Sequence, residues 1–184
     1  VSDFEGIGSD IESVCFGDMD GDGVKELFLC WDMFSSRTYQ LSMYSLKGNR
    51  IVESFTNNCA RVTVGDLTGD GRDNCLLFHM GTDQLTASLW TMKSNVMEEV
   101  GQVVVDTAVQ KLHADTVVAL TESQNGVFLD CTKGGDTLVT ELLFWDGKQL
   151  KAPLYNGNVS SENTLRLPAI PSGDMDEDGA WEWP

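Results

Sequence analysis

Three short segments place oxygen-bearing side chains at alternate positions, a spacing that suits a bound calcium ion. Each segment opens with Gly-Asp, and the three begin at Gly17, Gly65 and Gly173. Calcium takes six to eight oxygen ligands, and alternate residues of a tightly turning loop direct their oxygens toward one point. Further glycines inside the segments permit the sharp backbone turns that this convergence requires. The sequence therefore predicts two to three calcium sites.

Each loop is expected to supply ligands from positions 1, 3, 5, 7 and 9, counted from its first Asp, with a main-chain carbonyl at position 7. In the first loop these are Asp18, Asp20, Asp22, the Val24 carbonyl and Glu26. In the second loop they are Asp66, Thr68, Asp70, the Arg72 carbonyl and Asn74. In the third loop they are Asp174, Asp176, Asp178, the Ala180 carbonyl and Glu182. The second loop has the fewest carboxylates, so we expect it to bind calcium most weakly.

The EF-hand loop begins with a similar spacing, but it needs a bidentate Glu at position 12 between two helices. Position 12 is Leu29 in the first loop and Leu77 in the second, both within apolar, strand-like runs. The third loop ends before it reaches that position. These features exclude an EF-hand and the related dockerin.

The loops recur at a regular interval, which indicates a repeat protein. Asp18 and Asp66 are 48 residues apart, and Asp174 follows Asp66 after 108 residues, or two periods of 54. A unit without an acidic loop is therefore expected in between, with its loop position near Asp115. We expect one repeat region over residues 1–184, with units at about 11–58, 59–106 and 107–157 and the start of another at 158–184.

Each unit has the pattern of strands and turns, and helical periodicity is absent. In the first unit, residues 13–16, 26–31, 39–44 and 50–55 are apolar or alternating, and the second unit repeats this order. Four strands per unit of about 50 residues predict an all-β, propeller-like array of four-stranded antiparallel blades. Because propellers typically have about 4–8 blades, we expect a longer array or a ring completed by another copy.

The first loop with its flanks, from Phe16 to Leu27, resembles the FG-GAP repeat, as does the stretch from Val64 to Gly71. This repeat occurs in integrin α-subunit propellers and in bacterial surface proteins described as VCBS-like. The resemblance implies a structural calcium ion between the first two strands of a blade. It also implies an extracellular or cell-surface module for adhesion, or for recognition of a protein or glycan ligand. The third unit lacks the motif, and nothing after Leu29 corresponds to the "GAP" part of the name.

The net charge and the hydropathy of the sequence exclude some classes of binding partner. The formal net charge of −17 opposes binding to nucleic acid and to anionic membranes. No apolar run approaches the roughly 18 residues that a transmembrane helix needs, so no membrane insertion is expected.

The sequence contains few groups suited to catalysis. Its only histidines, His79 and His113, have no partner at metal or triad spacing, and the G-x-S-x-G and H-E-x-x-H motifs are absent. We therefore expect a protein that is not an enzyme. The alternative is a carbohydrate-active enzyme resembling a calcium-dependent polysaccharide lyase, or a carbohydrate-binding propeller, whose site would be assembled by the fold.

Five cysteines show no zinc-binding spacing: Cys15, Cys30, Cys59, Cys75 and Cys131. Most are expected to be buried as small hydrophobic side chains. A hairpin bridge between Cys15 and Cys30, or between Cys59 and Cys75, stays open as an alternative.

Overall fold

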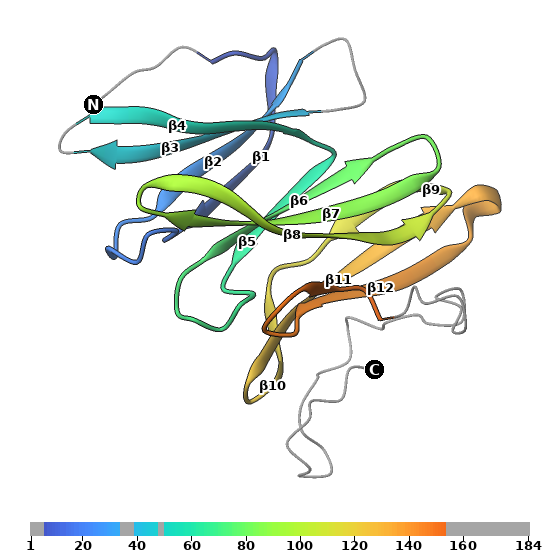
Figure 1. The fold of residues 1–184 in the computed structure, drawn as a ribbon. Coiled ribbons are helices and arrows are strands. Elements are labelled where there is room, and N and C mark those ends of the chain that lie inside the picture. The colour runs from blue at the N-terminus through green and yellow to red at the C-terminus, as the bar shows by residue number, and fades with distance from the viewer. Residues whose placement is uncertain (1–5, 34–38, 48–49, 154–184) are drawn as a thin grey trace.

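The computed structural model describes residues 6–33, 39–47 and 50–153 (Figure 1). Within these ranges the chain is all-β, as the sequence predicts, and its only helix is the short 3-10 turn Gly134–Asp136. No helix in this part of the chain is long and apolar enough to cross a membrane. The predicted third loop and the unit expected at 158–184 lie outside the described residues.

Three antiparallel sheets follow one another along the chain, here named A, B and C. Sheet A consists of β1 (Asp10–Gly17), β2 (Glu26–Asp32), β3 (Tyr39–Lys47) and β4 (Arg50–Cys59). Sheet B consists of β5 (Arg61–Gly65), β6 (Asn74–Met80), β7 (Gln84–Lys93) and β8 (Val96–Thr107). Sheet C consists of β9 (Val109–Ala114), β10 (Val118–Thr121), β11 (Gln124–Lys133), β12 (Leu138–Trp145) and β13 (Leu150–Lys151). Over the described ranges the sheets do not close a ring.

Sheet C differs from the other two at the position of the acidic loop. Its first strand, β9, pairs with β11, and β11 pairs further along with β10. The chain leaves β9 at Asp115 and enters a hairpin formed by β10 and β11. A hairpin therefore takes the place of the loop that the sequence of this unit lacks.

Sheet B is the middle layer, which explains the continuous apolar sequence of β6. Successive side chains of a strand point to opposite faces of its sheet. Cys75 and Leu77 belong to the apolar cluster shared with sheet A, whereas Leu76 and Phe78 belong to the cluster shared with sheet C. Both faces of the strand are thus buried between neighbouring sheets, and an apolar run replaces the usual alternation.

Glycine allows each sheet to approach the next one closely. A Cβ atom on Gly17 would lie 2.3 Å from Val64 Cγ1 of sheet B, and one on Gly65 would lie 2.7 Å from Val117 Cγ2 beside sheet C. The glycine that opens each of the first two acidic loops therefore has a packing role in addition to its role in the loop. A close glycine–valine contact thus occurs between sheets A and B and again between sheets B and C.

Substituting Gly17 with Ala tests this packing. We expect the free energy of unfolding to fall by about 1–3 kcal/mol, because the new methyl group overlaps Val64 and the sheets must separate. The double variant Gly17→Ala/Val64→Ala should lose less than the sum of the two single losses, as expected for residues in contact. Urea unfolding of the four proteins measures this coupling, and strictly additive losses would contradict the proposed contact.

The corresponding face of sheet A is uncovered. Val62 and Val64 of β5 pack against the cluster shared with sheet A, but their equivalents on β1, Val14 and Phe16, are 50% and 58% exposed. The side of β1 that matches the buried side of β5 therefore presents apolar side chains to solvent.

All five cysteines are free, and neither of the two hairpin bridges considered from the sequence is formed. The closest sulfur pair is instead Cys30 and Cys59, whose Sγ atoms are 3.7 Å apart in the core between sheets A and B. Burial raises the pKa of Cys75 well above its ordinary value and raises that of Cys131 to about 12. These two cysteines behave as small core residues with little thiolate character.

Candidate calcium sites

The first acidic loop connects the first two strands of sheet A. β1 and β2 pair up to Gly17 and Glu26, so the loop is held at both ends by the strand ladder. Inside it, Gly21 and Gly23 have φ values of 78° and 84°, a conformation that glycine adopts without strain. The chain can therefore coil tightly enough to turn alternate side chains inward.

The Asp18 carboxylate organises the backbone of this loop. Its Oδ1 accepts hydrogen bonds from the N–H groups of Gly21 (2.8 Å) and Asp22 (3.1 Å), and its Oδ2 accepts one from Gly23 (2.9 Å). At the end of the loop, Asp22 Oδ1 accepts from the Val24 N–H at 2.7 Å. The first predicted ligand is thus already fixed by main-chain contacts.

Three of the predicted ligands converge in the first loop. One oxygen each from Asp18, Asp20 and Asp22 lies within 4.8 Å of the other two. Calcium binds oxygens at about 2.3–2.6 Å, so ligands on opposite sides of the ion are about 5 Å apart. The three carboxylates therefore fit around one calcium ion, and their mutual repulsion favours a cation among them.

Glu26, the ligand predicted at position 9, lies at the C-terminal end of the loop, where β2 begins. It is only 4% exposed, and its Oε2 accepts a hydrogen bond from the Met19 N–H at 2.9 Å. Burial raises the pKa of this carboxyl group, the Met19 N–H opposes that rise, and nearby Asp20 and Asp22 add to it. A divalent cation in the loop would favour the charged form of Glu26.

The second loop, between β5 and β6, repeats most of this hydrogen-bond pattern. Asp66 Oδ1 accepts from the N–H groups of Gly69 (2.7 Å) and Asp70 (3.1 Å), and its Oδ2 accepts from Gly71 (2.9 Å). Asn74, buried like Glu26, accepts from the Leu67 N–H at 2.9 Å. The two loops therefore share one backbone conformation even though their side chains differ.

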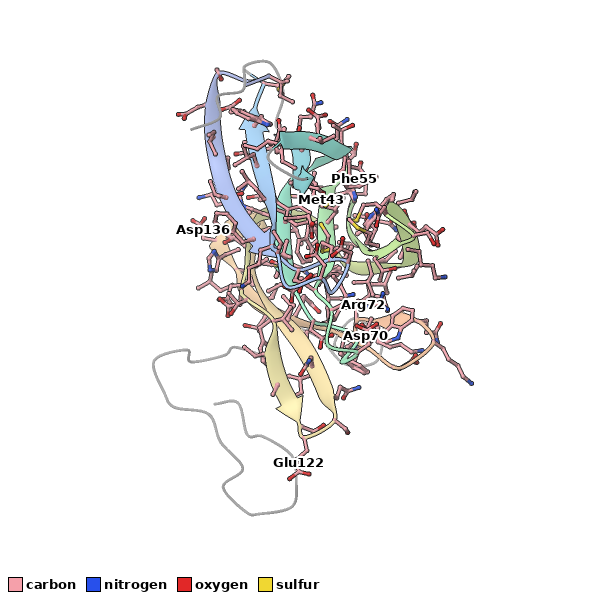
Figure 2. All side chains as sticks on the ribbon, turned by 90° about the vertical axis from the view of Figure 1, so that its left-hand side faces the viewer. Met43, Phe55, Asp70, Arg72, Glu122 and Asp136 are labelled. Atoms are coloured by element: carbon pink, nitrogen blue, oxygen red, sulfur yellow. The ribbon has the colours of Figure 1, made fainter. Side chains whose placement is uncertain are left out.

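The second loop contains a basic side chain, Arg72, that pairs with one of its predicted calcium ligands. Arg72 donates its backbone N–H and its guanidinium Nη2 to the Asp70 carboxylate, at 3.0 and 2.9 Å (Figure 2). Burial raises the pKa of Asp70, but the Arg72 contacts and the neighbouring Thr68 hydroxyl outweigh it, so the pKa lies below its ordinary value. Because Arg72 already balances this carboxylate and Thr68 replaces an Asp, the donor set of the second loop fits calcium less well than that of the first.

Comparison with known proteins provides evidence on the fold. No protein-family model matches the sequence, and a search of curated proteins gives no match. The chain is similar to a solved structure described as Bacillus licheniformis rhamnogalacturonan lyase PL11, with a TM-score of 0.65 and 15% sequence identity. The match covers 94% of this chain and 39% of that one. The similarity is one of fold.

Adjacent units are linked through the first Asp of each of the two described loops, Asp18 and Asp66, a feature that the sequence analysis missed. The Asp18 N–H donates to Asp73 Oδ2 (2.8 Å), and the Asp73 N–H donates to the Asp18 carbonyl (2.9 Å). The Asp66 carbonyl likewise accepts from Asn125 Nδ2 in sheet C at 2.6 Å. The aliphatic part of Arg72 also lies over Gly21 of the first loop. A ligand that stiffens one loop therefore acts directly on the interface between sheets.

The two histidines lie apart from these loops. His79 Nε2 is 3.3 Å from Ser88 Oγ, and burial lowers the pKa of this histidine. His113 lies on β9, where its Nε2 is 3.6 Å from an Asp115 carboxylate oxygen, and its side chain is largely exposed. Each histidine thus has a neighbour that sequence spacing alone did not assign.

Proposed function

We propose that this chain is a calcium-binding module built from propeller-type β repeats of the FG-GAP/VCBS-like kind, in which calcium is structural. The observation that carries the proposal is the convergence of Asp18, Asp20 and Asp22 in a loop between the first two strands of a sheet. The first loop is a stronger site than the second, because the Arg72–Asp70 pair weakens the second loop. The third loop, Gly173 to Glu182, is proposed from sequence alone.

The propeller-type arrangement is supported by the way the sheets succeed one another. Sheets A, B and C pack in chain order, and a close glycine–valine contact occurs at both interfaces. The exposed Val14 and Phe16 on β1 suit the packing of a further unit there. Further repeats or self-association would supply that unit and complete a ring or a longer array.

The proposed setting is extracellular or at the cell surface, and the proposed role is adhesion or recognition of a protein or glycan. Extracellular calcium modules bind with a Kd of about 10⁻⁴–10⁻³ M, which leaves them empty at cytosolic calcium levels and filled outside the cell. In that setting the ion stabilises the conformation of the loops, and the loops stabilise the interfaces between sheets.

A thermal melt tests the calcium proposal. With the Kd above, about 10 mM calcium should stabilise the fold by about 1.4–2.7 kcal/mol. For a chain of this size the melting temperature should rise by about 3–10 °C relative to a sample in chelator. Magnesium at the same concentration is the control, because it prefers a smaller octahedral site and keeps its waters. An identical melt in calcium and in chelator would exclude a structural ion.

A carbohydrate-active enzyme is the second candidate, and the similarity in fold to a polysaccharide lyase favours it. Incubation with acidic polysaccharides, followed by ultraviolet detection of unsaturated products, tests this candidate. The first proposal predicts no such products, and their appearance would establish lyase activity.

A further inference from the structure

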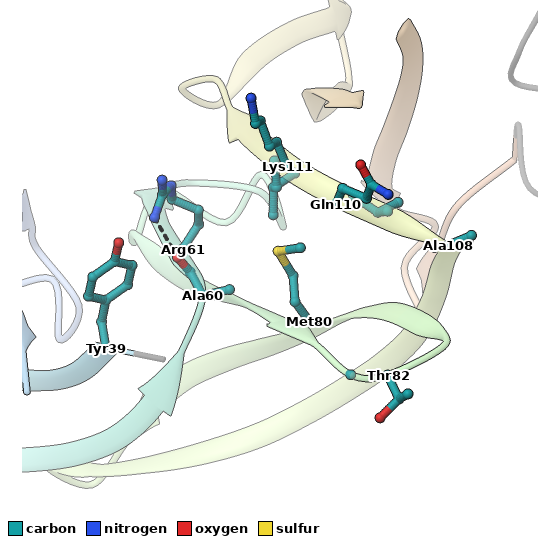
Figure 3. A pocket seen from close by; sticks show the side chains of 11 residues that line it. Tyr39, Ala60, Arg61, Met80, Thr82, Ala108, Gln110 and Lys111 are labelled. Atoms are coloured by element: carbon teal, nitrogen blue, oxygen red, sulfur yellow. Dashed lines mark hydrogen bonds between the residues drawn. The ribbon is translucent and has the colours of Figure 1, made fainter. Parts of the chain in front are cut away.

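A hollow of about 1250 Å³ lies at the end of the sheets opposite to the first two acidic loops (Figure 3). β5 begins at Arg61 and ends at Gly65, where the second acidic loop starts, so Arg61 and that loop are at opposite ends of the strand. The hollow is lined by the start of β3, the link from β4 to β5, the turn after β6 and the first residues of β9. It is thus separate from the first two proposed calcium sites and is formed by residues of all three sheets.

The charge of this hollow is opposite to that of the chain. Arg61 and Lys111 line it, and none of its eleven described lining residues is acidic. The whole chain has 29 acidic against 12 basic residues. The lining thus carries two cations and no acidic residue, and low-dielectric walls focus their field on a bound anion. The Glu12 carboxylate beside the lining offsets part of the Arg61 charge.

Arg61 is held in place before any ligand arrives. Its guanidinium stacks over the Tyr39 ring, 5.4 Å from the ring centre, and its Nη1 donates to the Ala60 carbonyl at 2.8 Å. Glu12 lies 3.4 Å from the same nitrogen in a partly exposed pair. A guanidinium has five N–H donors, so these contacts leave donors for a ligand.

Lys111 supplies a second positive charge, on a more flexible side chain than that of Arg61. It lies on β9 with an exposed side chain, and no carboxylate among the described residues is within ion-pair distance of it. An ammonium on a flexible stem can adjust to the position of an anion that the stacked guanidinium already orients. The pair is thus suited to a carboxylate.

The rest of the lining indicates which kind of carboxylate. Thr82 and Gln110 offer a hydroxyl and an amide, and Met80 offers an apolar surface (Figure 3). A pyranose ring has hydroxyl groups at its edge and C–H groups on its face, so it matches this mixture. We propose that the hollow binds a uronate-bearing oligosaccharide, with Arg61 and Lys111 receiving its carboxylate. This inference rests on the proposed role in ligand recognition and is independent of calcium binding.

Calorimetric titration with a galacturonic acid trimer tests the proposal. We expect the trimer to bind, a neutral galactose trimer and a triglutamate peptide not to bind, and added salt to weaken the interaction. Lys111→Met should weaken binding about tenfold or more, because a charge-assisted hydrogen bond contributes about 1.5–3 kcal/mol. Lys111→Arg should restore most of the affinity. Lys93→Met, which removes the same charge at the far end of β7, should bind like the unchanged protein.

Several results would overturn the assignment. They are no heat with the acidic trimer, equal binding of the neutral trimer or the peptide, and full affinity in Lys111→Met. A calcium-dependent rise in melting temperature alongside any of these results would show that the sugar site, and not the calcium proposal, has failed.

Discussion

Asp20→Asn is expected to reduce the rise in melting temperature that calcium produces by the share of the first loop, without lowering the melting temperature in chelator. Asp20 is one of the three converging carboxylates, and its Oδ1 accepts a hydrogen bond from the Asp22 N–H at 3.1 Å. Asparagine keeps an oxygen at that position and loses the charge. Calcium in the first loop should therefore no longer contribute the stabilisation of about 1.4–2.7 kcal/mol that one such site gives at about 10 mM.

Two further variants complete this experiment. Asp136→Asn removes the same charge from the 3-10 turn far from the loop, and it should keep the full response to calcium. Asp18→Ala should lower the melting temperature in calcium and in chelator alike, because three backbone N–H groups lose their acceptor. A complete calcium response in Asp20→Asn would place the ion elsewhere or show that it does not bind.

Lys133→Met is expected to reduce the free energy of unfolding by about 3–5 kcal/mol, because it leaves a buried carboxylate without its cation. Lys133 Nζ of β11 lies 2.9 Å from Asp106 Oδ2 of β8, so the pair joins sheet C to sheet B. The side chains are only 15% and 1% exposed. Asp106 Oδ1 keeps the hydrogen bond from the Thr107 N–H at 2.6 Å, but removing one partner of a buried ion pair is strongly destabilising.

Urea unfolding followed by tryptophan fluorescence measures this loss. Lys93→Met is the matched control, since Lys93 forms an exposed pair with Glu98 at 3.7 Å and such pairs contribute about 0–1 kcal/mol. The double variant Lys133→Met/Asp106→Leu should be more stable than Lys133→Met alone, because it removes the buried charge as well. Equal losses for Lys133→Met and Lys93→Met would refute a structural role for the buried pair.

The features that depend on local sequence could be predicted. A nine-residue loop contains its own acceptors and glycines, so its spacing indicates where the carboxylates converge, as it does for Asp18, Asp20 and Asp22. The apolar runs of β2 and β6 likewise indicate strands buried on both faces. These sequence patterns reflect contacts between residues close together in the chain, so they do not depend on how the sheets stack.

The features that depend on stacking could not be predicted. Asp73 and Asn125 bind the loops of the preceding unit across gaps of 55 and 59 residues, and no local pattern marks them. The sequence suggested the Arg72 carbonyl as a ligand but did not reveal that its guanidinium neutralises Asp70. The hollow with Arg61 and Lys111 likewise exists only because three sheets meet there.

A crystal structure determined at a calcium concentration well above the expected Kd tests the central proposal most directly. The account predicts anomalous density in the β1–β2 loop, about 2.3–2.6 Å from oxygens of Asp18, Asp20 and Asp22. It also predicts weaker density, or none, in the loop that contains Arg72. Carboxylates in the first loop that surround only water, or that turn away from one another in saturating calcium, would contradict it.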